Sequence, residues 1–185
     1  MALYSYRESP QALTPHNTYH WSLSARIFHW VSVLLLLLTW LMIVLDENFN
    51  GDFISIHKAL GLSMMCWTMA RLINRGFSHV PKPLPMPRWH TLLAHFTHAM
   101  LYVLLLAMPL AGWFATMYRG YDVSFFGLFD IPTLVSTNRD LARTLLGWHK
   151  DILWPALLAF TGLHILGALY HQWIRKDNLV KRMIK

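Results

Sequence analysis

Histidines are the residues of this chain whose number and placement point to chemistry. The chain has 185 residues, among them eleven histidines and a single cysteine. One cysteine is too few for a disulfide framework, a CxxC redox pair, a thiolate zinc site, an iron–sulfur cluster or a CxxCH attachment motif. Imidazole nitrogens are therefore the ligands with which this chain would hold a redox-active metal.

Seven histidines lie in long apolar stretches, where ionisable side chains are costly and indicate function, and four of them can be paired by depth. His29 lies early in the first stretch and His164 lies late in the last, so both lie toward one surface. His57 and His149 each lie near the start of a stretch at the opposite surface. Matching depths gives two pairs, His29 with His164 and His57 with His149. Two histidines on different helices can bind one haem iron from both faces and leave it no open position.

The spacing of His149 and His164 suits two haems, one near each surface. They are 15 residues apart, which is about 22 Å along a helix with a rise of about 1.5 Å per residue. At about 100° per residue, however, this spacing leaves the two side chains about 60° apart around the helix. Pro155 lies between them, and the sequence predicts a kink or a one-residue bulge there. Such a distortion would bring the two histidine side chains onto the same face of the helix. Small residues lie near three of the four histidines and would leave space for a porphyrin, although small residues also permit close helix packing. They are Ala25, Ser32, Gly61 and Ala168.

Two further histidines are candidates for supporting roles. His98 lies at a depth similar to that of His29 and His164, so it is an alternative iron ligand or a residue near a quinone. His171 lies seven residues after His164, where it would hydrogen-bond a quinone or pass a proton; an interfacial histidine facing lipid headgroups is the alternative. Basic side chains near the predicted helix ends are candidates for holding haem propionates; they are Arg26, Arg71, Lys58 and Lys150.

The elements that must position these residues are four apolar stretches. A membrane helix needs about 20 mainly apolar residues, and the stretches that qualify are about 27–45, 54–73, 92–117 and 145–174. The chain is 55% hydrophobic and only 14% charged, against about 25% charged in ordinary soluble domains. The sequence therefore predicts an all-α integral membrane four-helix bundle over residues 22–185, preceded by a polar tail over residues 1–21.

The distribution of basic residues predicts the orientation. Eleven of the 16 lysines and arginines fall before the first stretch (residues 1–26), in the 71–90 loop or after the last stretch. By the positive-inside rule both termini and that loop are cytoplasmic. The net charge of +7 is then a consequence of topology, and no nucleic acid is expected as a partner. On the exterior side, residues 120–132 are expected to form an amphipathic stretch on the membrane surface.

Taken together, these residues resemble the bacterial cytochrome b561 family, within the larger group of four-helix membrane cytochromes that includes hydrogenase b-type subunits. The resemblance extends over about residues 22–183 and rests on an ordered set of motifs. These are FHW (28–30), HKALG (57–61), RLINR (71–75), the proline-rich loop (80–88), AHFTHAMLYVLLLAMPLAGW (94–113), WH (148–149) and GLHILGALYHQWIRKDNLVKRM (162–183).

The resemblance implies two non-covalent haems b in a multi-pass protein of the bacterial inner membrane. Their ligands would be His29, His57, His149 and His164. It also implies electron transfer from a periplasmic donor to ubiquinone or another quinone, and some similar members oxidise superoxide. The alternative is a cytochrome b anchor subunit that passes electrons from a separate dehydrogenase or hydrogenase. A metal-ion transporter is disfavoured because no predicted span contains a carboxylate away from its ends; Asp151 lies near the start of the last one. The chain departs from the family pattern in the last helix, where a ligand spacing nearer 14 is expected.

Overall fold

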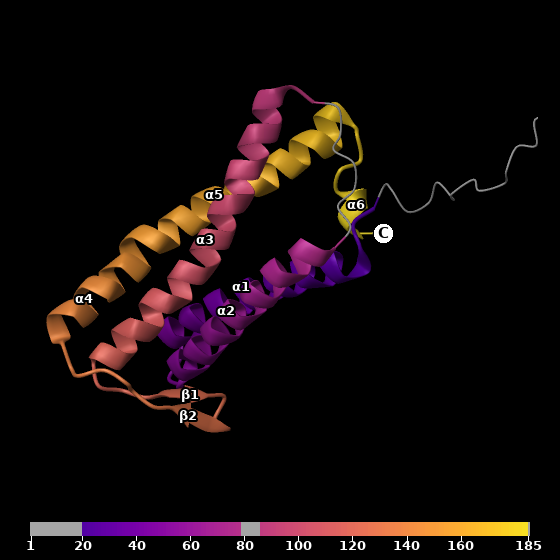
Figure 1. Cartoon of the computed structure of the whole chain (residues 1–185). Helices are drawn as coiled ribbons and strands as arrows, with labels where there is room; N and C mark the ends of the chain where they lie inside the picture. The colour runs from indigo at the N-terminus through magenta and orange to yellow at the C-terminus, as the bar shows by residue number, and fades with distance from the viewer. Residues whose placement is uncertain (1–19, 79–85, 185) are drawn as a thin grey trace, which may run out of the picture.

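Four long helical rods dominate the computed structural model, which describes residues 20–78 and 86–184. Most of the predicted N-terminal tail (1–19) and most of the proline-rich loop (79–85) lie outside the described residues. The helices lie close to the stretches expected from the sequence (Figure 1). In chain order the elements are α1 (Leu23–Asn48), α2 (Phe53–Phe77), α3 (Arg88–Tyr118), β1 (Val123–Phe125), β2 (Phe129–Ile131), α4 (Arg139–Gly147), η2 (Trp148–Leu153), α5 (Trp154–Leu169), η3 (Tyr170–Arg175) and α6 (Lys181–Ile184).

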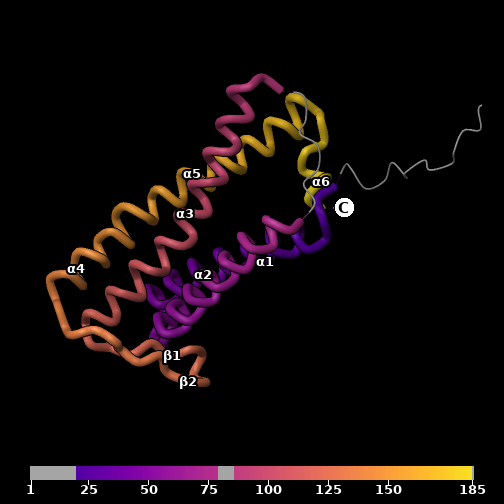
Figure 2. The backbone as a smooth tube through the Cα atoms, in the orientation of Figure 1, coloured from indigo at the N-terminus to yellow at the C-terminus, as the bar shows by residue number. Residues whose placement is uncertain are grey.

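The first two rods, α1 and α2, form an antiparallel pair that lies side by side in both views (Figures 1 and 2). Each begins at a polar N-cap. The Ser22 hydroxyl accepts a hydrogen bond from the Ala25 N–H, and the Asp52 carboxylate accepts one from the Ser55 N–H, both at 3.3 Å. Capping in this way satisfies N–H groups that have no partner within the helix. The caps thus fix where the two helices start.

The third rod, α3, packs against α2 on one side and against α4 and α5 on the other. The fourth rod is one continuous helix over Arg139–Arg175, in which α4 and α5 alternate with the π-helical segments η2 and η3. Pro155 lies in the first turn of α5, directly after η2; having no N–H, it cannot donate the hydrogen bond that a regular helical turn requires there. Pro109 lies inside α3, where proline bends a helix.

A small β-hairpin closes one end of the molecule, which we call the hairpin end (Figure 1). Strand β1 pairs antiparallel with β2, with Val123 opposite Ile131. Phe126 and Gly127 both have positive φ, +53° and +71°, as a type I′ turn requires. Part of the segment expected to be an amphipathic stretch on the membrane is therefore a hairpin, whose residue Val123 is buried at its contact with α2.

The opposite end, which we call the terminal end, carries the C-terminal segment. There the Trp30 indole N–H donates to the Met183 carbonyl at 3.0 Å, and the Trp21 N–H donates to the Arg182 carbonyl at 3.3 Å. These bonds hold α6 near the start of α1 (Figure 2). His29, near the start of α1, and His164, late in α5, lie toward this end; His57, near the start of α2, and His149, in η2, lie toward the hairpin end.

Three of the rods are long and apolar enough to cross a membrane by length and composition: Leu23–Asn48, Arg88–Tyr118 and Arg139–Arg175. Much of their apolar surface faces outward, as the exposed side chains of Leu34, Leu37 and Leu166 illustrate. Helix α2 does not meet that criterion, and it contains Lys58, Arg71 and Arg75. A fourth span over 54–73 and cytoplasmic termini therefore remain predictions.

Candidate functional site

The first histidine pair lies toward the hairpin end, where α2 contributes His57 and η2 contributes His149. Their ring centres are 6.1 Å apart. Each ring is held through Nδ1 by a main-chain carbonyl of a neighbouring helix. His57 Nδ1 is 2.9 Å from the Thr39 oxygen of α1, and His149 Nδ1 is 2.8 Å from the Met108 oxygen of α3.

These two hydrogen bonds determine which ring nitrogen carries the proton. A carbonyl oxygen only accepts, so Nδ1 must be the donor in both His57 and His149. Nε2 of each neutral ring then keeps a free lone pair, which is the form that binds a metal ion. Metal-binding histidines in proteins characteristically donate their other ring N–H in this manner.

The second pair lies toward the terminal end, where α1 contributes His29 and α5 contributes His164. Their ring centres are also 6.1 Å apart. The structure thus brings together the same two pairs that depth matching in the sequence predicts. Iron ligation by these four side chains remains a prediction.

Both pairs have the separation that a shared metal ion needs. Two imidazoles on opposite sides of one ion, with metal–nitrogen distances of about 2.0 Å, have ring centres about 6.3 Å apart. Moreover, α1 does not pack closely on α5, and α2 does not pack closely on η2. In each pair the two rings therefore lie between helices whose backbones are not in close contact, which leaves space beside the rings. Each pair thus has the separation that fits a haem, and at the hairpin end the hydrogen bonds also hold both rings in the metal-binding form.

The π-helical segment η2 (Trp148–Leu153) begins one residue before His149. A π-helical turn accommodates one extra residue in an α-helix. The 15-residue spacing between His149 and His164 then behaves like a spacing of about 14 in an unbroken α-helix. The bulge predicted from the offset of these two histidines is confirmed, and it lies just before Pro155.

Small residues near the histidines have different roles. A Cβ added at Gly112 would lie 3.1 Å from both Cε1 and Nδ1 of His149, so α3 needs glycine there for the ring to approach. At Gly61, by contrast, an added Cβ would meet only the Pro109 side chain at 3.9 Å, which is ordinary packing. The sequence reasoning did not assign Gly112 to a site.

Arg71 of α2 points into the terminal-end pair. Its Nη2 lies 3.1 Å from His29 Nδ1, and its Nη1 donates to the Ser32 hydroxyl at 3.3 Å. The guanidinium carbon also lies 5.3 Å from the centre of the Tyr102 ring. His98 lies beside the same pair, with its ring centre 5.2 Å from that of His164. His98 therefore remains an alternative ligand.

The other basic candidates lie at both ends of the bundle. Arg26, one turn before His29, is half-buried, and its Nε has no hydrogen-bond partner among the described residues. Lys58 follows His57 and is half-buried between charges of opposite sign, the Asp52 carboxylate and the Arg119 guanidinium. Lys150 is exposed in η2. Their assignment to haem propionates stays a prediction.

His171 lies in the π-helical segment η3 (Tyr170–Arg175) and forms a short hydrogen bond with the Asp177 carboxylate. The distance from His171 Nδ1 to Asp177 Oδ2 is 2.6 Å, and the two side chains are only 12% and 18% exposed. Arg175 Nε lies 3.7 Å from the same carboxylate oxygen. Lys176 adopts a left-handed conformation with φ +56°, which turns the chain back so that Asp177 reaches the ring. The sequence reasoning did not assign Asp177 a role. The only indication in the sequence was a carboxylate in the polar segment RKDN (175–178), a few residues after His171.

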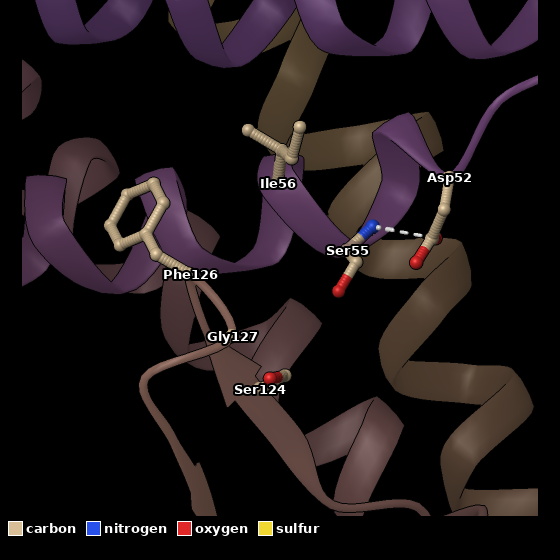
Figure 3. Close-up of a pocket in the computed structure, with 6 residues that line it drawn as sticks. All are labelled: Asp52, Ser55, Ile56, Ser124, Phe126 and Gly127. Atoms are coloured by element: carbon tan, nitrogen blue, oxygen red, sulfur yellow. Dashed lines mark hydrogen bonds between the residues drawn. The ribbon is translucent and has the colours of Figure 1, made fainter.

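A pocket beside the hairpin has no histidine among its lining residues. It is lined by Asp52, Ser55, Ile56, Ser124, Phe126 and Gly127 (Figure 3). Among these residues Asp52 is the one ionisable group, and its carboxylate is engaged by the Ser55 N–H. Within residues 20–78 and 86–184, no cluster of three or more His, Cys, Asp or Glu side chains could hold a metal ion. The candidate sites are therefore the two histidine pairs.

Comparison with known proteins gives consistent matches over most of the chain. A family model described as prokaryotic cytochrome b561 matches residues 20–185. A probable superoxide oxidase CybB of Yersinia pestis is 34% identical over 165 residues, covering 84% of this chain and 90% of that protein. Cytochrome b561 homolog 2 of Escherichia coli (strain K12) is 30% identical over 167 residues, covering 85% and 87%.

Proposed function

The chain belongs to the prokaryotic cytochrome b561 family, whose members are membrane b-type cytochromes of electron transfer, and from this we propose that it is a diheme, quinone-linked oxidoreductase of the bacterial inner membrane. The observation that carries the proposal is the pair of histidine–histidine contacts, each with ring centres 6.1 Å apart. Haem supplies one-electron redox chemistry when it is bound. His57 and His149 would hold one haem, and His29 and His164 the other.

We propose that electrons enter at the hairpin end, on the exterior side of the membrane, and leave at the terminal end. The proposed donor is superoxide, supported by the printed name of the relative from Yersinia pestis. Two superoxide anions each lose one electron to give dioxygen, and one quinone takes up the two electrons and two protons to give a quinol. Lys58, Lys150 and Arg119 carry positive charge at the hairpin end, which favours the approach of an anionic donor.

The quinone is proposed to react near the His171–Asp177 pair. With the carboxylate beside Nδ1, the ring keeps Nε2 available to donate a proton to, or accept one from, a quinone oxygen. The side-chain oxygen of Gln172 is buried without a partner among the described residues, so it can accept a hydrogen bond from a quinol hydroxyl. His98 is the second candidate for this proton transfer. Arg26, Lys58 and Lys150 are proposed to bind propionates, whereas the Arg71 guanidinium is engaged by His29 and Ser32.

The test begins with purified protein in detergent or nanodiscs. A reduced-minus-oxidised spectrum with haem quantified per chain should give two low-spin b haems, and no bound haem would overturn the proposal. Enzymatically generated superoxide should then reduce the bound haem, and added ubiquinone should reoxidise it. Superoxide dismutase provides the control for the donor. Reduction by a separate dehydrogenase or hydrogenase but not by superoxide would instead identify an anchor subunit.

A further inference from the structure

The two histidine pairs differ in what lies against Nδ1 of their rings. At the hairpin end, His57 and His149 both donate to main-chain carbonyls. At the terminal end, His29 Nδ1 faces the Arg71 guanidinium at 3.1 Å. An acceptor beside Nδ1 makes an imidazole a stronger electron donor to a metal. A guanidinium has five N–H donors, no acceptor and a permanent positive charge, so His29 has a cation beside Nδ1 where His57 and His149 have a carbonyl acceptor.

Contacts from three helices hold Arg71 in this position. Its backbone belongs to α2, while Nη1 donates to Ser32 of α1, a residue that is only 5% exposed. On its other side the guanidinium faces the ring of Tyr102 in α3. A positive charge restrained in this way, in surroundings with little water, acts on nearby charges with little screening.

We propose that Arg71, through its contact with His29, gives the terminal-end haem a higher reduction potential than the hairpin-end haem. This inference rests on the proposed function, because it requires a haem at each pair. Reduction lowers the positive charge of the iron by one, so a nearby cation favours the reduced form. The loss of an acceptor beside Nδ1 acts in the same direction. A higher potential at the terminal end makes electron transfer from the exterior donor toward the quinone favourable.

The test is a spectroelectrochemical titration of the purified protein that resolves the two haems. Arg71→Gln removes the charge, and Arg71→Lys keeps a charge without the planar guanidinium. Arg75→Gln is the matched control, because Arg75 lies one turn further along α2 and stacks on Trp21, with its guanidinium carbon 4.6 Å from the ring centre. A His57→Ala background, which should retain only the terminal-end haem, assigns the two potentials.

We expect Arg71→Gln to lower the midpoint of the terminal-end haem and to leave the other midpoint nearly unchanged. A tenfold loss in the preference for the reduced form corresponds to a shift of about 59 mV for one electron. Arg71→Lys should give a smaller shift than Arg71→Gln, and Arg75→Gln should shift neither midpoint by a comparable amount.

Three results would overturn the inference while leaving the proposed function intact. The first is an unchanged terminal-end midpoint in Arg71→Gln. The second is a raised midpoint, which would mean that Arg71 stabilises a deprotonated, more strongly donating His29. The third is loss of the terminal-end haem from both Arg71 variants, which would make Arg71 a residue that holds the haem. Absence of haem from the unmodified protein would instead overturn the proposed function itself.

Discussion

Gly112 of α3 lies directly against the imidazole of His149, and a methyl group there would come within 3.1 Å of two ring atoms. We predict that Gly112→Ala displaces the ring and weakens retention of the hairpin-end haem by about tenfold or more, the usual size of such effects around metal ligands. Haem per chain after gel filtration measures this. Gly76→Ala is the matched control, because a Cβ at Gly76 meets nothing within 4 Å. Equal haem content in the two variants would contradict the prediction.

Single histidine replacements should remove one haem each. We predict that His57→Ala and His149→Ala lose the hairpin-end haem, whereas His29→Ala and His164→Ala lose the terminal-end haem. A low-spin iron with one axial ligand missing loses its characteristic spectrum. Difference spectra and haem quantification should show a fall from two haems to one in each variant.

His98→Ala distinguishes the alternative ligand, since His98 and His29 both lie beside His164. We predict that His98→Ala retains two haems with bis-histidine spectra. Loss of one haem from His98→Ala together with its retention in His29→Ala would assign the ligand to His98 instead. Electron paramagnetic resonance of the oxidised protein identifies the axial ligands in either case.

The π-helical segment η2 should tolerate the loss of a residue but not the gain of one. Deleting Ile152, whose side chain is 57% exposed, reduces the spacing of His149 and His164 to 14 residues and allows an ordinary α-helix there. We predict that this variant keeps both haems.

Inserting one alanine after Lys150 is the matched opposite change. The π-helical turn of η2 already accommodates one extra residue. A second extra residue would rotate His149 by about 100° relative to His164. We therefore predict that the insertion variant loses one haem. Retention of both haems by the insertion variant, or loss of one by the deletion variant, would show that η2 does not set the register.

The His171–Asp177 hydrogen bond should matter for both stability and quinone reaction. Asp177→Asn replaces the carboxylate that accepts from His171 Nδ1 with a weaker, neutral acceptor, so we predict a loss of about 1–3 kcal/mol and slower reoxidation of the haem by ubiquinone. Thermal unfolding and stopped-flow spectroscopy measure the two effects. Reduction by the donor should be unchanged, because the pair lies at the terminal end.

Asp140→Asn is the control for that change. Asp140 pairs with Arg143 at 3.2 Å, but the two side chains are 94% and 79% exposed, and such surface pairs contribute little. We expect Asp140→Asn to change neither stability nor reoxidation appreciably. Faster or unchanged reoxidation in Asp177→Asn would argue against a quinone site at His171.

The sequence by itself determined the helices and the depth of their histidines. Apolar length predicts a membrane helix because a bilayer has a fixed thickness, and a histidine's position along such a helix gives its depth. Depth was enough to pair His57 with His149 and His29 with His164. Even the bulge near Pro155 followed from the sequence, because the angular offset of two residues on one helix is simple geometry.

Only the tertiary structure decided the partners of each ring. The carbonyls of Thr39 and Met108, the guanidinium of Arg71 and the carboxylate of Asp177 all reach their histidines through particular contacts. Helical periodicity gives the face of one helix but not its rotation or crossing angle relative to the next, and a hydrogen bond depends on tenths of an ångström. For that reason the difference between the two pairs, carbonyls at one end and an arginine at the other, is a property of the folded protein alone.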